Sequence, residues 1–209
     1  MNTAQLWSLR HITDPIILAS SSPRRADILR AIGLPYKRIP PRLEEGIYGD
    51  WDGGEKLRQR ALGKALEVKG HFPDHVVLAA DTIVLLGQDV LEKPKNRENA
   101  RSMLQRLSGR WHEVWTALCL VPAKRSQPRI LLSTTRVLFS HLTADEIAVY
   151  IETGEPLDKA GAYGIQGVGG LWVREIQGCY FNVVGLPVSE LWNLLNQKDD
   201  PSSSMVRQS

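Results

Sequence analysis

The sequence has little cysteine and no long apolar run. Only two of its 209 residues are cysteine, and they form no CxxC pair, so neither a disulfide framework nor a cysteine-based zinc site is indicated. We expect both thiols, Cys119 and Cys179, to be buried and unpaired. No stretch approaches the ~20 apolar residues that a membrane span requires, and residues 1–14 hold no hydrophobic signal core. These absences predict a cytoplasmic protein that does not associate with membranes.

A strong excess of one charge is missing as well. The chain has 26 basic and 23 acidic residues, a net charge of +3, and a pI near 8.9. A dedicated duplex-DNA binder usually has a larger basic excess or a basic run, so we expect no stable nucleic-acid complex. The hydrophobic and charged fractions, 43% and 23%, are those of a globular protein. The length fits one large domain or two tightly packed lobes.

Several familiar catalytic motifs are also absent. The chain contains no GxxxxGK[ST] loop, and His112-Glu113 is followed by Thr116, so that HExxH fails. The glycines of residues 161–170 form no GxGxxG between a strand and a helix, and Ser20–Ser22 lack the GxSxG pattern. A P-loop nucleotide hydrolase, a zinc protease, a dinucleotide-binding domain and an α/β-hydrolase are therefore not indicated.

Apolar periodicity predicts strands and helices that mix along the chain. Strands are expected at residues 16–20, 76–86, 90–93, 111–121, 130–140, 171–176 and 180–184. Helices are expected at residues 24–32, 55–68, 97–107, 144–153 and 188–195. This order predicts an α/β fold with one mixed sheet or two lobes. The polar residues 197–209 are expected to form a disordered tail.

The turn at Ser20–Arg25 is the first candidate site. A buried strand ends there, and Ser22 followed by Pro23 favours a helix start. Unpaired N–H groups and the positive dipole end of that helix, with two arginines beside them, suit a phosphate. A plain helix cap with solvated arginines explains the same residues.

Asp81 is the second candidate. It lies inside an eleven-residue apolar run, where an ionised carboxylate is costly to bury unless it is paired or binds a metal. A catalytic base or metal ligand would explain it, because perturbed acids cluster at functional sites. A paired core carboxylate, or a position at a strand end, is the alternative.

Two lysines are further candidates. Lys64 lies on the apolar stripe of its helix, between Ala61 and Val68, so that it either extends along the stripe edge to solvent or points into a cleft toward an anion. Lys93, between Glu92 and Pro94 at a strand end, is equally ambiguous when taken alone.

Read together, these segments resemble the Maf family of nucleoside triphosphate pyrophosphatases. Each motif is weak, but six occur in the order of the family and span about residues 15 to 195. They are Leu18–Arg25 (LASSSPRR), Ala79–Val84 (AADTIV), Glu92–Pro94 (EKP), Leu107–His112 (LSGRWH), Glu155–Gly167 (EPLDKAGAYGIQG) and Gly178–Pro187 (GCYFNVVGLP). The resemblance implies an elongated mixed β-sheet with flanking helices in two lobes around a central cleft, similar to inosine triphosphatase. It also implies one such domain over residues 15–196, preceded by an extension of residues 1–14.

The resemblance also implies roles for single residues. Asp81 matches the general base of the family, and Glu45 matches a second metal ligand beside it. The pair that usually reads Asp-Glu is Glu44-Glu45 here. Arg24 matches a substrate-contacting arginine, and Lys64 and Lys93 match polar residues of the cleft. Thr82 and Gln166 match positions tied to selection of the base, and Arg24 is expected to contribute to that selection. Ser20, Ser22 and Arg25 are expected to bind substrate because they belong to the phosphate-suited turn described above.

The implied reaction is hydrolysis of a nucleoside triphosphate to its monophosphate and pyrophosphate, with Mg²⁺ or Mn²⁺ as cofactor. The stretch Asp158–Gly167 resembles the subgroup that acts on dTTP and UTP, and modified pyrimidine nucleotides are included in that expectation. A homodimer is implied by the resemblance alone. A nucleotide- or nucleic-acid-binding regulator of cell division without turnover is the alternative, and an inosine/xanthosine triphosphate pyrophosphatase shares the reaction but not the motifs.

Overall fold

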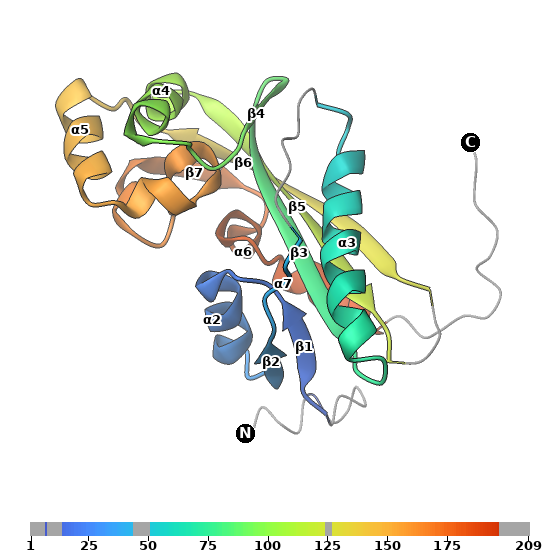
Figure 1. Cartoon of the computed structure of the whole chain (residues 1–209). Helices are drawn as coiled ribbons and strands as arrows, with labels where there is room; N and C mark the ends of the chain where they lie inside the picture. The colour runs from blue at the N-terminus through green and yellow to red at the C-terminus, as the bar shows by residue number, and fades with distance from the viewer. Residues whose placement is uncertain (1–6, 8–13, 44–50, 124–126, 197–209) are drawn as a thin grey trace.

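The computed structural model describes residues 7, 14–43, 51–123 and 127–196 (Figure 1). Glu45, the extension apart from Trp7 and Asp14, and the predicted tail lie outside these residues. None of the helices described is long and apolar enough to cross a membrane.

A mixed sheet of seven strands forms the centre of the described chain, as the sequence predicts. Its order is β2-β1-β3-β5-β6-β7, with β4 paired to β3. Strand β1 is parallel to β2 and β3, and the other pairs are antiparallel. The strands are β1 (Ile16–Ala19), β2 (Tyr36–Arg38), β3 (Val77–Leu86), β4 (Asp89–Leu91), β5 (Trp111–Val121), β6 (Arg129–Phe139) and β7 (Val173–Gln177).

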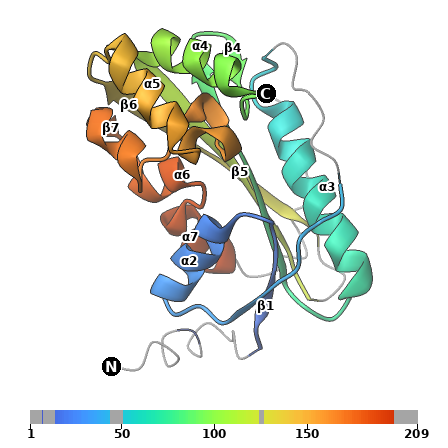
Figure 2. The same ribbon diagram turned by 60° about the vertical axis from the view of Figure 1, so that its left-hand side comes forward.

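Helices cover both faces of this sheet, and α3 covers one of them (Figure 2). The α-helices are α2 (Pro23–Ala31), α3 (Glu55–His71), α4 (Arg97–Leu107), α5 (Ala144–Glu152), α6 (Tyr180–Val184) and α7 (Val188–Asn196). Three 3-10 helices, η1 (Glu155–Asp158), η2 (Ala160–Ala162) and η3 (Val168–Trp172), follow α5. Most predicted boundaries are confirmed within a few residues. The Asn96 side chain caps α4, and Thr143 and Glu146 form the predicted capping box of α5.

The core consists of three clusters, which explain why two lobes form. On the α3 face, Leu57 and Ala61 pack against Ala79 and other residues of β1, β3 and β5. On the opposite face, a first lobe forms where α2 and α7 pack near the end of β3 that contains Leu78. A second lobe forms where α4, α5 and the 3-10 helices pack around Val84. The stretch of β3 between Leu78 and Val84 therefore lies between the two lobes.

Two predicted strands are wrong and one strand was missed. Residues 180–184 form helix α6 instead of a strand, and the strand expected from residue 171 begins only at Val173 because η3 extends to Trp172. The three-residue strand β2 was not predicted; it is mostly polar and exposed, and its pairing with β1 holds it in place. Cys119 is buried as expected, but Cys179 is only partly buried.

The buried His112 of β5 makes the stability of the folded protein depend on pH. Its ring is buried, lies edge-on to Phe139 and Tyr163, and has Nε2 2.9 Å from the Tyr163 hydroxyl. Burial lowers the pKa of His112 from 6.5 to about 4. The unfolded chain therefore takes up this proton at a higher pH than the folded protein, and stability falls as the pH drops from 6.5 toward 4.

We expect His112 to account for a loss of about 2 kcal/mol in the free energy of unfolding between pH 6.5 and about pH 4.5. Urea unfolding at both pH values, on the protein and on a His112→Gln variant that cannot titrate, measures this loss. An equal loss in the variant would show that other groups cause it.

Candidate active site

The candidate site lies where the direction of the sheet connections changes. From β1 the chain crosses through α2 to β2 on one side, and from β2 it returns through α3, on the opposite face, to β3 on the other side. Ligands bind preferentially at such switch points, beyond the carboxyl ends of the strands. Pairing of β3 with β1 ends at Ala79, and pairing with β4 begins at Val84. The stretch that contains Asp81 and Thr82 thus faces the space between these two strands.

A pocket of about 500 Å³ occupies this place. Its walls come from the end of β1 and the start of α2, from α3, β3, the segment after β4, and the segments around η1, η2 and α6. It brings together every predicted site residue that the structure describes: Ser20, Ser22, Arg24, Arg25, Lys64, Asp81, Thr82, Lys93 and Gln166. Glu45, the predicted second metal ligand, lies outside the described residues.

The serine turn leads into the N-terminus of α2, as predicted, with Ser22 at the N-cap position and Pro23 in the first turn. The Ser22 side chain makes no capping hydrogen bond; instead Ser20 Oγ accepts one from the Ser22 amide, 3.1 Å away. The positive end of the nine-residue helix thus borders the pocket, where it would favour an anion.

Arg25, in contrast, is buried and holds the walls together. Its guanidinium donates to the carbonyl of Gly185 (2.8 Å), to Thr82 Oγ1 (2.9 Å) and to Ser20 Oγ (3.2 Å). Thr82 Oγ1 in turn lies 3.0 Å from Thr116 Oγ1. Arg25 therefore joins α2, β3 and the end of α6 through its own side chain.

Asp81 is a paired carboxylate and also lines the pocket. The two interpretations of its position, a paired core carboxylate and a site residue, are therefore compatible. Lys64 Nζ lies 2.5 Å from its Oδ1, and Arg60 Nη1 lies 3.8 Å from its Oδ2. The side chains of Asp81 and Lys64 are 9% and 7% exposed. A carboxylate so deeply placed needs such partners to offset its loss of hydration.

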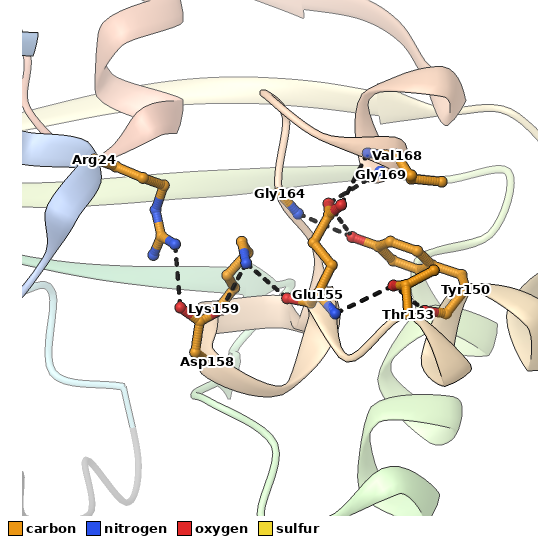
Figure 3. Close-up of polar contacts among 9 residues, drawn as sticks. All are labelled: Arg24, Tyr150, Thr153, Glu155, Asp158, Lys159, Gly164, Val168 and Gly169. Atoms are coloured by element: carbon orange, nitrogen blue, oxygen red, sulfur yellow. Dashed lines mark hydrogen bonds and ion pairs between the residues drawn. The ribbon is translucent and has the colours of Figure 1, made fainter. Parts of the chain in front are cut away.

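Arg24, which lines the pocket, pairs with Asp158 of the second lobe (Figure 3). Its Nη1 lies 3.3 Å from Asp158 Oδ2, and Lys159 Nζ donates to Asp158 Oδ1 at 2.6 Å. Partial burial opposes ionisation of Asp158, but the hydrogen bond and charge of Lys159, with the charge of Arg24, lower its pKa overall. The exposed Arg24–Asp158 pair is of the kind that contributes little to stability.

Sequence reasoning missed Arg60, Asp158 and Lys159 as pocket residues. A signal for Arg60 was present: it precedes Lys64 by four residues on α3 and so shares its helix face. Asp158 and Lys159 lie in a motif that carries the resemblance, but their spacing alone predicts no contact with α2.

The fold and pocket define an α/β protein whose cationic site suits a phosphorylated small molecule, and comparison with known proteins gives the family. The model of Maf-like proteins matches residues 15–198, and the chain belongs to this family. Three curated relatives carry the name dTTP/UTP pyrophosphatase. That of Syntrophomonas wolfei is 44% identical over 87% of this chain and 96% of the relative. Those of Moorella thermoacetica and Methylobacillus flagellatus are each 46% identical over 86% of this chain and over 93% and 90% of the relative.

Among solved structures, the Staphylococcus aureus Ham1 protein aligns with a TM-score of 0.44 and 14% identity, over 61% of this chain and 72% of that one. A likeness at that level adds nothing to the family assignment, which depends on the sequence match.

Proposed function

We propose that this protein is a nucleoside triphosphate pyrophosphatase that hydrolyses dTTP and UTP to the nucleoside monophosphate and pyrophosphate. The observation that carries the proposal is one pocket in which a buried carboxylate, Asp81, lies among cationic side chains of several elements. Curated relatives whose name is dTTP/UTP pyrophosphatase match this chain over most of its length.

The proposed reaction is attack by water on the α-phosphorus. A bond forms between the water oxygen and the α-phosphorus, the bond from that phosphorus to the oxygen bridging to the β-phosphate breaks, and pyrophosphate leaves. Asp81 accepts the proton of the water. The cationic residues of the pocket offset the charge that develops on the leaving group; they are Arg24, Arg60, Lys64, Lys93 and Lys159. The helix terminus after Ser22 adds backbone N–H donors.

A divalent cation, Mg²⁺ or Mn²⁺, belongs to the proposal. Within the described residues no group of three His, Cys, Asp or Glu side chains could hold a metal. Mg²⁺ needs no such cage, because it is commonly held by one or two carboxylates together with substrate phosphates and water. Asp81 suits that role, with Glu45 as the predicted second ligand. The cation would polarise the phosphate and lower the pKa of bound water.

Selection of the base is proposed for Gln166 and Thr82, as the resemblance implies, and for Arg24. Gln166 lies in the segment of the second lobe that borders the pocket, and its amide has both a donor and an acceptor for a pyrimidine edge. Thr82 Oγ1 already contacts Arg25 and Thr116, so its contribution would depend on that network. Modified pyrimidine nucleotides stay within the proposal, and the homodimer and the cytoplasmic location stay predictions.

A nucleotide panel tests this function. We expect the protein with Mg²⁺ or Mn²⁺ to release pyrophosphate and monophosphate from dTTP and UTP at a kcat/KM about 10-fold or more above that for dATP, dGTP or ITP. Chromatography of the products distinguishes pyrophosphate from orthophosphate. Orthophosphate as the product, or preference for ITP, would contradict the proposal. Nucleotide binding without any release would favour the non-catalytic regulator.

A further inference from the structure

The segment that carries Gln166 wraps around one carboxylate, that of Glu155 (Figure 3). Glu155 Oε2 accepts the amide N–H of Val168 at 2.9 Å, and Oε1 accepts the amide of Gly169 at 3.2 Å. Oε1 also accepts the hydroxyl of Tyr150 at 2.8 Å, and that hydroxyl accepts the amide of Gly164 at 3.1 Å. Backbone groups on both sides of Gln166 are thus fixed by Glu155 and its partner Tyr150.

The glycines of this segment are explained by the same contacts. A Cβ atom at Gly167 would lie 2.3 Å from Glu155 Oε2, and one at Gly169 would lie 2.5 Å from the Tyr150 hydroxyl. Side chains at either position would push the backbone away from the carboxylate. The glycine-rich pattern therefore serves close wrapping around Glu155.

Glu155 is suited to hold the loop because its carboxylate stays charged. Burial raises the pKa of Glu155. The hydrogen bonds from Tyr150, Val168 and Gly169 and the charge of Lys159 lower it by more, so that the pKa lies below its usual value. A carboxylate that accepts several hydrogen bonds in its charged form is a strong anchor.

The same residue also connects to the opposite wall of the pocket. Its backbone carbonyl accepts Lys159 Nζ at 2.7 Å. Lys159 holds Asp158, and Asp158 pairs with Arg24 of α2. One short segment, residues 155–159, therefore supports both Gln166 and the partner of Arg24.

We propose that Glu155 is a positioning residue for base selection: its carboxylate, with the Tyr150 hydroxyl, fixes the loop of residues 164–169 so that Gln166 is held at the pocket. This inference depends on the proposed function for the identity of the base. Glu155 is not among the residues that line the pocket; it acts through the backbone of the loop.

Two variants test the inference, Glu155→Gln and Tyr150→Phe. The first replaces an acceptor oxygen with a donor amide, and the second removes only the hydroxyl. The matched control for Glu155→Gln is Glu152→Gln, because Glu152 lies three residues before Glu155 and forms an exposed ion pair with Arg97. The second control is Ile147→Val, which causes a small loss of core packing in the same lobe. Hydrogen exchange of the amides of Gly164, Val168 and Gly169 reports on the loop, and kcat/KM for dTTP and dATP reports on selection.

We expect Glu155→Gln to lower kcat/KM for dTTP about 10-fold and that for dATP less than about 2-fold, because only the base contact is displaced. Tyr150→Phe should lower the ratio of kcat/KM for dTTP to kcat/KM for dATP as well, but by a smaller factor. Exchange of the three amides should accelerate in both variants and in neither control.

An equal fall for both nucleotides with the ratio intact would overturn the inference, since Glu155 would then be merely structural. Unchanged exchange at the three amides in both variants would overturn it as well. A wild-type protein that releases pyrophosphate from no nucleotide would contradict the proposed function instead, and the exchange measurement would still decide whether Glu155 fixes the loop.

Discussion

Asp81→Asn should lower kcat for pyrophosphate release by about 10³-fold, the range expected when a general base is lost. The amide keeps the size of the carboxylate but cannot take up the proton of the attacking water. Its oxygen can still accept the hydrogen bond from Lys64, which lies 2.5 Å from Asp81 Oδ1. We therefore expect stability to fall by no more than about 3 kcal/mol, the lower end for breaking a buried ion pair, and the variant to remain folded.

Steady-state kinetics with dTTP and urea unfolding on the same preparation measure both effects. Asp89→Asn is a matched control, because Asp89 is an aspartate of the neighbouring strand β4 that pairs with Arg106 outside the pocket. It should change kcat less than about 2-fold, as expected for a group that does not meet the transition state. A near-native rate in Asp81→Asn would remove Asp81 from the role of base.

Arg24 and Arg25 are adjacent in sequence, yet their replacement by Met should give opposite results. Arg25→Met removes the donor from Gly185 O, Thr82 Oγ1 and Ser20 Oγ. We expect a loss of about 3 kcal/mol or more in the free energy of unfolding, because acceptors in a buried region lose a charged donor. Arg24→Met removes an exposed pair with Asp158, so its stability should change by less than about 1 kcal/mol.

The main effect of Arg24→Met should be on substrate binding. Arg24→Met should raise the KM for dTTP about 10-fold through the loss of a cation at the triphosphate, while its urea midpoint should stay close to that of the wild type. Urea midpoints and KM values for the pair are the measurement. Equal stability of the two variants would show that the hydrogen bonds of Arg25 do not hold the walls of the pocket.

The long elements could be predicted because pattern and environment agree. The strand expected at 111–121 is observed with those bounds, and α4 begins at its asparagine cap. Residues 180–184 read as a strand because Tyr, Phe and Val favour strands, but tertiary contacts decide otherwise. Thr135 Oγ1 bonds both the N–H and the carbonyl of Cys179, and Asn182 Nδ2 donates to Val114 O. Contacts between distant segments cannot be read from a local pattern.

The site likewise combines features that the motifs predict with features that depend on distant contacts. Eight predicted site residues of the motifs, together with Lys64, line one pocket, but the motifs could not tell which of two neighbouring arginines turns inward. Successive helix residues point about 100° apart, and Arg25 is fixed by partners as distant as Thr82 and Gly185, the latter 160 residues later. The partner of Asp81 was open for the same reason, since it depends on how α3 packs against β3.

The pocket draws its walls from segments far apart in the chain, from Ser20 to Gly185. During synthesis, a ribosome would have to extend the chain past Gly185 before the carbonyl that holds Arg25 exists. The pocket can therefore be completed only late in synthesis, because Val183, Val184 and Gly185 form part of its wall.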